Sequence, residues 1–136
     1  MGLAERRAAK EFETKIFPGW KDKIITAAQF DVPIEVDWEA ISEPESAHLY
    51  NECWPQVYFE SLVEGLKGVT MDDMGKEALR GGLKKIVITN KSDTSSASNA
   101  IKFEGGVLTI DHKPCSNVHH VDERTQVIRK ALEEKL

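Results

Sequence analysis

The sequence predicts an α+β fold, in which amphipathic helices from the N-terminal, central and C-terminal parts of the chain pack against an antiparallel sheet. The apolar spacing is helical through most of the first half and extended through much of the second half, which places about four strands at residues 34–38, 84–90, 99–104 and 107–112. The last three strands follow one another without a predicted helix between them, and such strands usually pair antiparallel. A chain of 136 residues has the length of one domain, so we expect residues 1–136 to form a single unit.

The N-terminal segment has the pattern of two consecutive helices. Its first apolar stripe consists of Leu3, Ala8, Ala9, Phe12 and Ile16. Pro18 and Gly19 interrupt this stripe, and Trp20 and Ile24 resume it at helical spacing. Pro33 ends the helical pattern, because proline has no backbone N–H to donate.

A short strand is predicted next, at residues 34–38. Ile34, Val36 and Trp38 alternate there with the acidic residues Glu35 and Asp37. Alternation of this kind indicates a half-buried strand whose carboxylates face the solvent.

The central helices begin at a capping box, in which Ser42 and Glu45 can satisfy the free N–H groups of the first turn. Tyr50, Trp54 and Tyr58 follow at near four-residue spacing and share one face. We interpret this face as core, because a small domain needs its aromatic side chains to bury area. Tyr50 and Trp54 are retained as candidate binding residues, because aromatic side chains are also enriched at interfaces.

The second half of the chain has the extended period. Residues 84–90 contain the β-branched, almost entirely apolar run KIVIT, which predicts a strand in the centre of the sheet. The Ser-rich residues 90–99 predict a loop. Gly105 and Gly106 then predict a two-residue hairpin turn between the last two strands. An amphipathic helix with Val121, Ile128 and Leu132 on its apolar stripe closes the chain.

Composition and charge exclude several classes of function. The net charge of −5, with basic residues scattered along the chain, argues against general nucleic-acid binding. No apolar run approaches the roughly 20 residues that a membrane span needs. The charged N-terminal segment lacks the apolar centre of a signal peptide, and Cys53 and Cys115 form no CxxC pair. We therefore expect a cytoplasmic protein with two reduced thiols.

Residues 111–122, DHKPCSNVHHVD, are the densest group of chemically active side chains. Asp, His and Cys are zinc ligands, and a site needs three or four of them to converge at about 2.0–2.3 Å from the ion. The candidate metal ligands are Asp111, His112, Cys115 and His119, with His120 as an alternative to His119. The spacing matches no standard zinc pattern, so we expect no cofactor. Zinc is the one cofactor that these side chains would suit.

Two other interpretations of this segment stay open. In the first it is structural, with Pro114 shaping a turn and Ser116 or Asn117 capping the last helix. In the second, Cys115 is a nucleophile activated by a neighbouring histidine and by the N-terminus of that helix.

No complete catalytic set assembles from the sequence, so we expect a binding or interaction domain without catalytic activity of its own. Its partner would be a protein or a small molecule. A homo-oligomer is also compatible with the aromatic face and the amphipathic termini. The alternative is an enzyme, either a metal-assisted hydrolase or a thiol enzyme, that uses the His, Cys and Asp side chains of residues 111–122.

Overall fold

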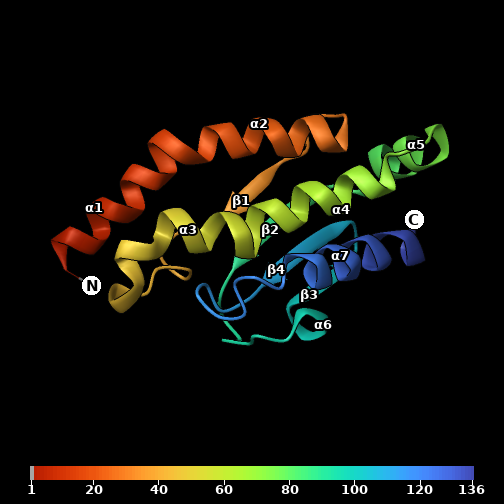
Figure 1. Cartoon of the computed structure of the whole chain (residues 1–136). Helices are drawn as coiled ribbons and strands as arrows, with labels where there is room; N and C mark the ends of the chain where they lie inside the picture. The colour runs from red at the N-terminus through yellow and green to blue at the C-terminus, as the bar shows by residue number, and fades with distance from the viewer. Residues whose placement is uncertain (1) are drawn as a thin grey trace.

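Helices lie on one face of a four-stranded sheet in the computed structural model, which describes residues 2–136 (Figure 1). The first helical rod is formed by α1 (Leu3–Glu11), η1 (Phe12–Ile16) and α2 (Phe17–Ala28). The second rod is formed by η2 (Pro44–Leu49), α3 (Tyr50–Trp54), η3 (Pro55–Glu60) and α4 (Ser61–Val69). The remaining long helices are α5 (Asp73–Gly82) and α7 (Val121–Lys135). Helix α4 packs between α2 and α7, so these three helices form the helical layer.

Both rods continue through a proline instead of breaking there. The segments η1 and η3 are π-helical, and they lie just before Pro18 and at Pro55. Proline removes one N–H of the helix and its ring crowds the preceding turn. A locally wider turn accommodates this defect while the helix axis continues. The interruption expected at Pro18 is therefore a π-helical segment inside a longer rod, and Pro55 is accommodated in the same way.

The sheet is mixed, with strand order β1-β2-β4-β3. Its strands are β1 (Ile34–Val36), β2 (Lys85–Thr89), β3 (Ile101–Glu104) and β4 (Val107–Asp111). Each lies inside one of the four predicted ranges, and the helix-plus-sheet class is confirmed. The pairs β1–β2 and β2–β4 are parallel, whereas β3–β4 is antiparallel. The predicted hairpin at Gly105 and Gly106 is present, with both glycines at positive φ. The prediction of an antiparallel sheet is wrong for the other two pairs.

The connections explain the parallel pairs. In the sequence, the second rod and α5 come between β1 and β2. A helical connection of this length brings the chain back to the end of the sheet where β1 begins, so β2 runs parallel to β1. After β2, residues 90–96 and the short helix α6 (Ala97–Ala100) carry the chain to the outer edge of the sheet. There β3 forms, and the hairpin brings β4 back between β2 and β3. Strands that are consecutive in sequence are therefore not all neighbours in the sheet.

The core lies between the helices and one face of the sheet. Ile86, Ile88, Leu108 and Ile110 alternate onto this face, and none of them is exposed to solvent. The predicted aromatic face packs against them as core: Tyr50, Trp54 and Tyr58 are all buried. The rings of Tyr50 and Trp54 stack with their centroids 4.0 Å apart. The interpretation of this face as core is confirmed.

The opposite face of the sheet is open. Lys85, Val87 and Thr109 are half-buried there, and Glu35 and Lys102 are exposed. This pattern shows that no helix within residues 2–136 covers that face. None of the helices in the described part of the chain is long and apolar enough to cross a membrane.

Candidate functional site

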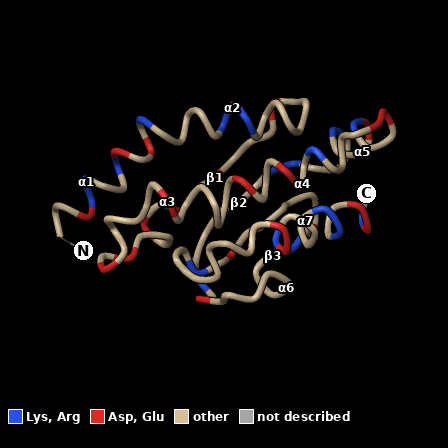
Figure 2. Tube along the Cα trace, viewed as in Figure 1, with Lys and Arg blue, Asp and Glu red and all other residues tan. Residues whose placement is uncertain are grey.

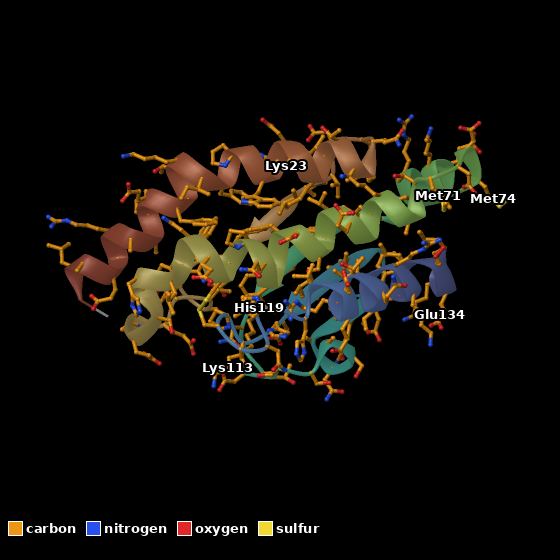
Figure 3. All side chains as sticks on the ribbon, viewed as in Figure 1. Lys23, Met71, Met74, Lys113, His119 and Glu134 are labelled. Carbon is orange, nitrogen blue, oxygen red and sulfur yellow. A yellow bond between two sulfur atoms is a disulfide. The ribbon has the colours of Figure 1, made fainter. Side chains whose placement is uncertain are left out.

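Residues 111–122 form the junction between β4 and α7, beside η3 of the second rod. Lys113 and His119 mark this junction in Figure 3. It lies at the carboxyl ends of the parallel strands β2 and β4, where the loops that follow the two strands meet. The backbone N–H of His112 donates to the carbonyl of Thr89 at 3.2 Å, which ties these two strand ends together.

Asp111 organises the loop that follows β2. Its carboxylate oxygen Oδ1 accepts hydrogen bonds from the backbone N–H groups of Lys91, at 2.7 Å, and Ser92, at 3.1 Å. A carboxylate that accepts two backbone donors fixes the turn from which they come. In this structure Asp111 therefore shapes the neighbouring loop.

His112 is completely buried. Its Nδ1 lies 2.6 Å from the carbonyl oxygen of Lys113, and its own carbonyl accepts a 2.5 Å hydrogen bond from the hydroxyl of Tyr58. The other ring nitrogen, Nε2, is buried and makes no hydrogen bond of ordinary geometry with the described residues. Burial lowers the pKa of the imidazole below its ordinary value, and the nearby carbonyl of Lys113 opposes this shift only in part.

Cys115 forms a disulfide with Cys53 of α3, with 5.3 Å between the two Cα atoms. Neither of these two cysteines is free, so the expectation of reduced thiols is wrong for this structure. A disulfide sulfur is neither the thiolate that binds zinc nor the thiolate that acts as a nucleophile. The bond instead attaches the junction to the second rod.

His119 and His120 lie at the exposed end of the junction. Nδ1 of His119 is 3.3 Å from the amide oxygen of Gln56, and Nδ1 of His120 is 3.5 Å from the carboxylate of Glu123. The structure therefore brings the predicted metal ligands into one segment but gives each a different partner. No three His, Cys, Asp or Glu side chains within residues 2–136 are arranged to hold a metal ion.

Arg124 is the residue of this site that the sequence analysis missed. It lies in the first turn of α7 and is only 1% exposed. Its guanidinium donates to the carbonyl oxygens of Asn117 at 2.8 Å, Val118 at 2.8 Å and Gln56 at 3.3 Å. No carboxylate pairs with it in the described part of the chain. A signal was available in its position between Val121 and Ile128, which places it on the apolar stripe of the helix.

Backbone carbonyl groups stabilise the buried positive charge of Arg124. Burial lowers the pKa of its guanidinium and raises the pKa of the Tyr58 hydroxyl well above its ordinary value. Oriented carbonyl dipoles compensate a buried cation when no counter-ion is near. Because two of the carbonyls belong to the junction and one to η3, the guanidinium fastens the junction to the second rod. The disulfide makes the same connection covalently.

A groove of about 470 Å³ lies between α2 and α4. Trp20 and Val63 form its apolar part, and Lys23, which Figure 3 labels, lies 4.5 Å from the centre of the Trp20 ring. Lys67, Glu60 and Glu64 also line the groove. Acidic and basic side chains both line the groove, so its charge favours neither an anionic nor a cationic ligand.

The open face of the sheet carries an ordered row of side chains. The strand registers place Glu35, Val87, Thr109 and Lys102 side by side across β1, β2, β4 and β3. The row thus has a carboxylate at one edge, an ammonium group at the other and two β-branched residues in the middle. Lys85 lies next to this row, with Nζ 3.3 Å from the carboxylate of Glu35.

Comparisons with protein families, curated proteins and solved structures gave no match.

We predict that Arg124→Ala lowers the free energy of unfolding by about 3 kcal/mol, because three carbonyls lose charged donors and a large buried side chain disappears. Urea unfolding followed by circular dichroism measures this loss. Arg129→Ala is the matched control on the same helix. Its ion pair with Glu133 is partly exposed, and its loss should cost less than about 1 kcal/mol. Equal losses in the two variants would contradict the role given to Arg124.

Reduction of the disulfide should lower the free energy of unfolding by about 2–4 kcal/mol, because the bond closes a long loop in the unfolded chain. Its cysteines are 62 residues apart. Urea unfolding with and without a reductant measures the difference. Cys53→Ser/Cys115→Ser should match the reduced protein and should not respond to the reductant. A wild-type protein whose unfolding is unchanged by the reductant would show that the bond does not stabilise the fold.

Stability should fall as the pH drops from about 7 to about 5. The fold keeps His112 neutral, so the unfolded chain, whose histidines have pKa values near 6.5, binds this proton first. The free energy of unfolding then falls by at most about 1.4 kcal/mol per pH unit from this group. Glu43, whose pKa is raised mainly by burial, has the opposite effect around its own lower pKa. His112→Gln should flatten the slope, whereas the exposed His48→Gln should leave it unchanged. An unaltered slope in His112→Gln would sink the prediction.

Proposed function

We propose that this protein is a binding domain that engages a protein partner through the open face of its sheet. The observation that supports this proposal is the position of Val87. It lies in the continuous apolar run of β2, between two parallel neighbours, and its side chain is on the open face. Parallel strands with such runs are normally covered on both faces. This chain covers only one, and a partner would supply the second cover.

The composition of the open face suits a protein surface. Val87, Val107 and Thr109 occupy its centre, and Glu35 and Lys102 lie at its edges. An apolar centre with a charged rim is the usual anatomy of a protein–protein interface. Small molecules prefer concave pockets that bury most of their surface. A hollow of about 310 Å³ beside β3 and β4 is lined by polar and apolar side chains together, among them Lys102, Thr109 and Val107.

Charge argues against nucleic acid as the partner. Lysine and arginine are interspersed with aspartate and glutamate along the whole trace (Figure 2). Nucleic-acid binding needs a concentrated basic surface that neutralises phosphates. The open face itself carries both signs of charge, in Glu35 and Glu104 and in Lys85 and Lys102.

No observation favours the enzyme alternative. A metal-assisted hydrolase would need several of Asp111, His112, Cys115 and His119 to converge on one ion, and their contacts lead to separate partners. A thiol enzyme would need Cys115 as a thiolate. The cytoplasmic location remains a proposal as well, and the disulfide weighs against it because cytosolic thiols are kept reduced.

A photo-crosslinking residue placed at Thr109 tests the proposed binding face in cells of the source organism. We expect a discrete cross-linked adduct from Thr109, because this position lies in the centre of the face. The same residue placed at Gln126, which is exposed on α7, should give no such adduct. Val87→Arg should abolish the Thr109 adduct, because it puts a charge in the apolar centre. Circular dichroism of this variant checks that it folds.

Two outcomes of this experiment would overturn the proposal. Thr109 and Gln126 could give the same adducts, or Val87→Arg could leave the Thr109 adduct unchanged in a folded protein. Either result would show that the open face is not the binding surface.

A further inference from the structure

We propose that the partner is a second copy of this chain, stacked open face to open face about a two-fold axis that runs parallel to the strands. This inference rests on the proposed function, because it names the partner of the same face. Its basis is the order of charges across the sheet. In the row of Glu35, Val87, Thr109 and Lys102, the order is acidic at the β1 edge and basic at the β3 edge.

A two-fold axis between β2 and β4 exchanges the two edges of the sheet. It places β1 of one copy opposite β3 of the other, so Glu35 faces Lys102 of the second copy. Because the symmetry repeats every contact, the row forms this ion pair twice, once at each end. In the middle of the row, Val87 faces Thr109 of the second copy. The central contact is thus between β-branched side chains of similar shape.

The next row fits the same arrangement. It contains Lys85 on β2, Val107 on β4 and Glu104 on β3. The two-fold axis places Lys85 opposite Val107 of the second copy, on the strand next to Glu104. Within one chain Lys85 pairs with Glu35 at 3.3 Å and Glu104 with Lys135 at 4.0 Å, so this row adds an exchange of partners and no new charge. At the carboxyl end of the strands, Thr89 is buried and the Asp111 carboxylate accepts from the loop that follows β2, so this end supplies no free partner for an ion pair. In the two rows that contain Glu35 and Lys85, no two like charges lie directly opposite one another.

The alternative stacking has the opposite electrostatics. A two-fold axis perpendicular to the strands would place each strand opposite its own copy. Glu35 would then face Glu35, and Lys102 would face Lys102. Like charges placed opposite each other across an interface are repulsive, so they select against this register. The charges therefore favour one of the two in-plane axes.

A second copy matches this face better than an unrelated protein does, because its complementarity follows from symmetry. Another protein would need its own row of base, two small apolar groups and acid at the same spacing. Stacked sheets also pack with their strands nearly aligned, which an axis parallel to the strands preserves. Two-fold dimers are the commonest form of homo-oligomer.

The size of the face predicts a weak dimer. Four strands about 4.8 Å apart, and three rows about 7 Å apart, span roughly 300 Å² of flat area in each copy. Stable complexes bury about 800 Å² in each partner. We therefore expect reversible association of the weak, transient class, which must be measured at high protein concentration.

Analytical ultracentrifugation from about 10 μM to about 1 mM tests the proposal with complementary charge reversals, a range that covers weak association. Wild-type protein should pass from monomer to dimer over this range. Glu35→Lys and Lys102→Glu should each shift the dissociation constant upward at least tenfold, because each puts like charges at both ends of the row. An equimolar mixture of these two variants should recover association, because a row with two basic ends in one chain then faces a row with two acidic ends in the other.

Lys130→Glu and Glu134→Lys are the matched controls. They make the same changes in net charge at an exposed ion pair on α7, which belongs to the helical layer and not to the open face, and should associate like the wild type. Added salt should weaken the wild-type dimer, because exposed ion pairs are screened.

Three results would overturn the second-copy proposal: a wild-type protein that is monomeric at about 1 mM, a dimer insensitive to both reversals, or no recovery on mixing. The mass of the Thr109 adduct separates this failure from that of the proposed function. An adduct heavier or lighter than two chains would keep the open face as a binding surface for another protein. No specific adduct at Thr109, together with a wild-type protein that is monomeric at about 1 mM, would remove both proposals.

Discussion

The direction in which the chain crosses the sheet constrains the rest of the structure. From β1 to β2 and from β2 to β4, each parallel step moves toward the same edge. The connection from β1 to β2 is a helical crossover, and such crossovers are almost always right-handed, which fixes the face on which the second rod and α5 lie. Folds that cover both faces reverse direction part-way along the sheet. Among the four described strands there is no such reversal. Helices α2 and α7, which precede β1 and follow β4, pack on either side of α4 from this crossover, so the helices gather on one face and Val87 and Thr109 are left on the other.

The one-sided helical layer also determines where the junction between β4 and α7 must lie. The chain leaves β4 at the carboxyl end of the sheet and has to return over the core to place α7 beside α4. Arg124 holds this return through three carbonyl groups, and the disulfide between Cys53 and Cys115 holds it covalently. An apolar residue in place of Arg124 would leave the carbonyls of a tight, half-buried turn without donors. A buried guanidinium with no carboxylate partner is therefore explained by the backbone that surrounds it.

Local patterns were enough to locate the strands and the aromatic core. Alternation identified β1, the apolar run identified β2, and the paired glycines identified the hairpin of β3 and β4. The pairing of the strands could not be obtained in this way, because it depends on where residues 90–100 cross the sheet. Sequence spacing gave no reason to join Cys53 and Cys115, which come together only when α3 packs beside the junction. For His112 the residue type suggested a metal ligand or a base. Its burial, which lowers the pKa of the imidazole, and its contact with the carbonyl of Lys113 depend on the fold and could not be predicted from the residue type.

Residues 111–122 drew attention through their reactive side chains, whereas the apolar run in β2 gains its meaning only once its neighbours are known to be parallel. A metal site in residues 111–122 depended on residue types that must converge, and their individual contacts hold them apart. The rule for the run in β2 is that a continuous apolar run between parallel strands is covered on both faces. That rule is satisfied on the side of Ile86 and Ile88 and is unsatisfied on the side of Val87. A valine left half-buried in the middle of a parallel sheet, with opposite charges at its two edges, is a surface that another sheet face can complete.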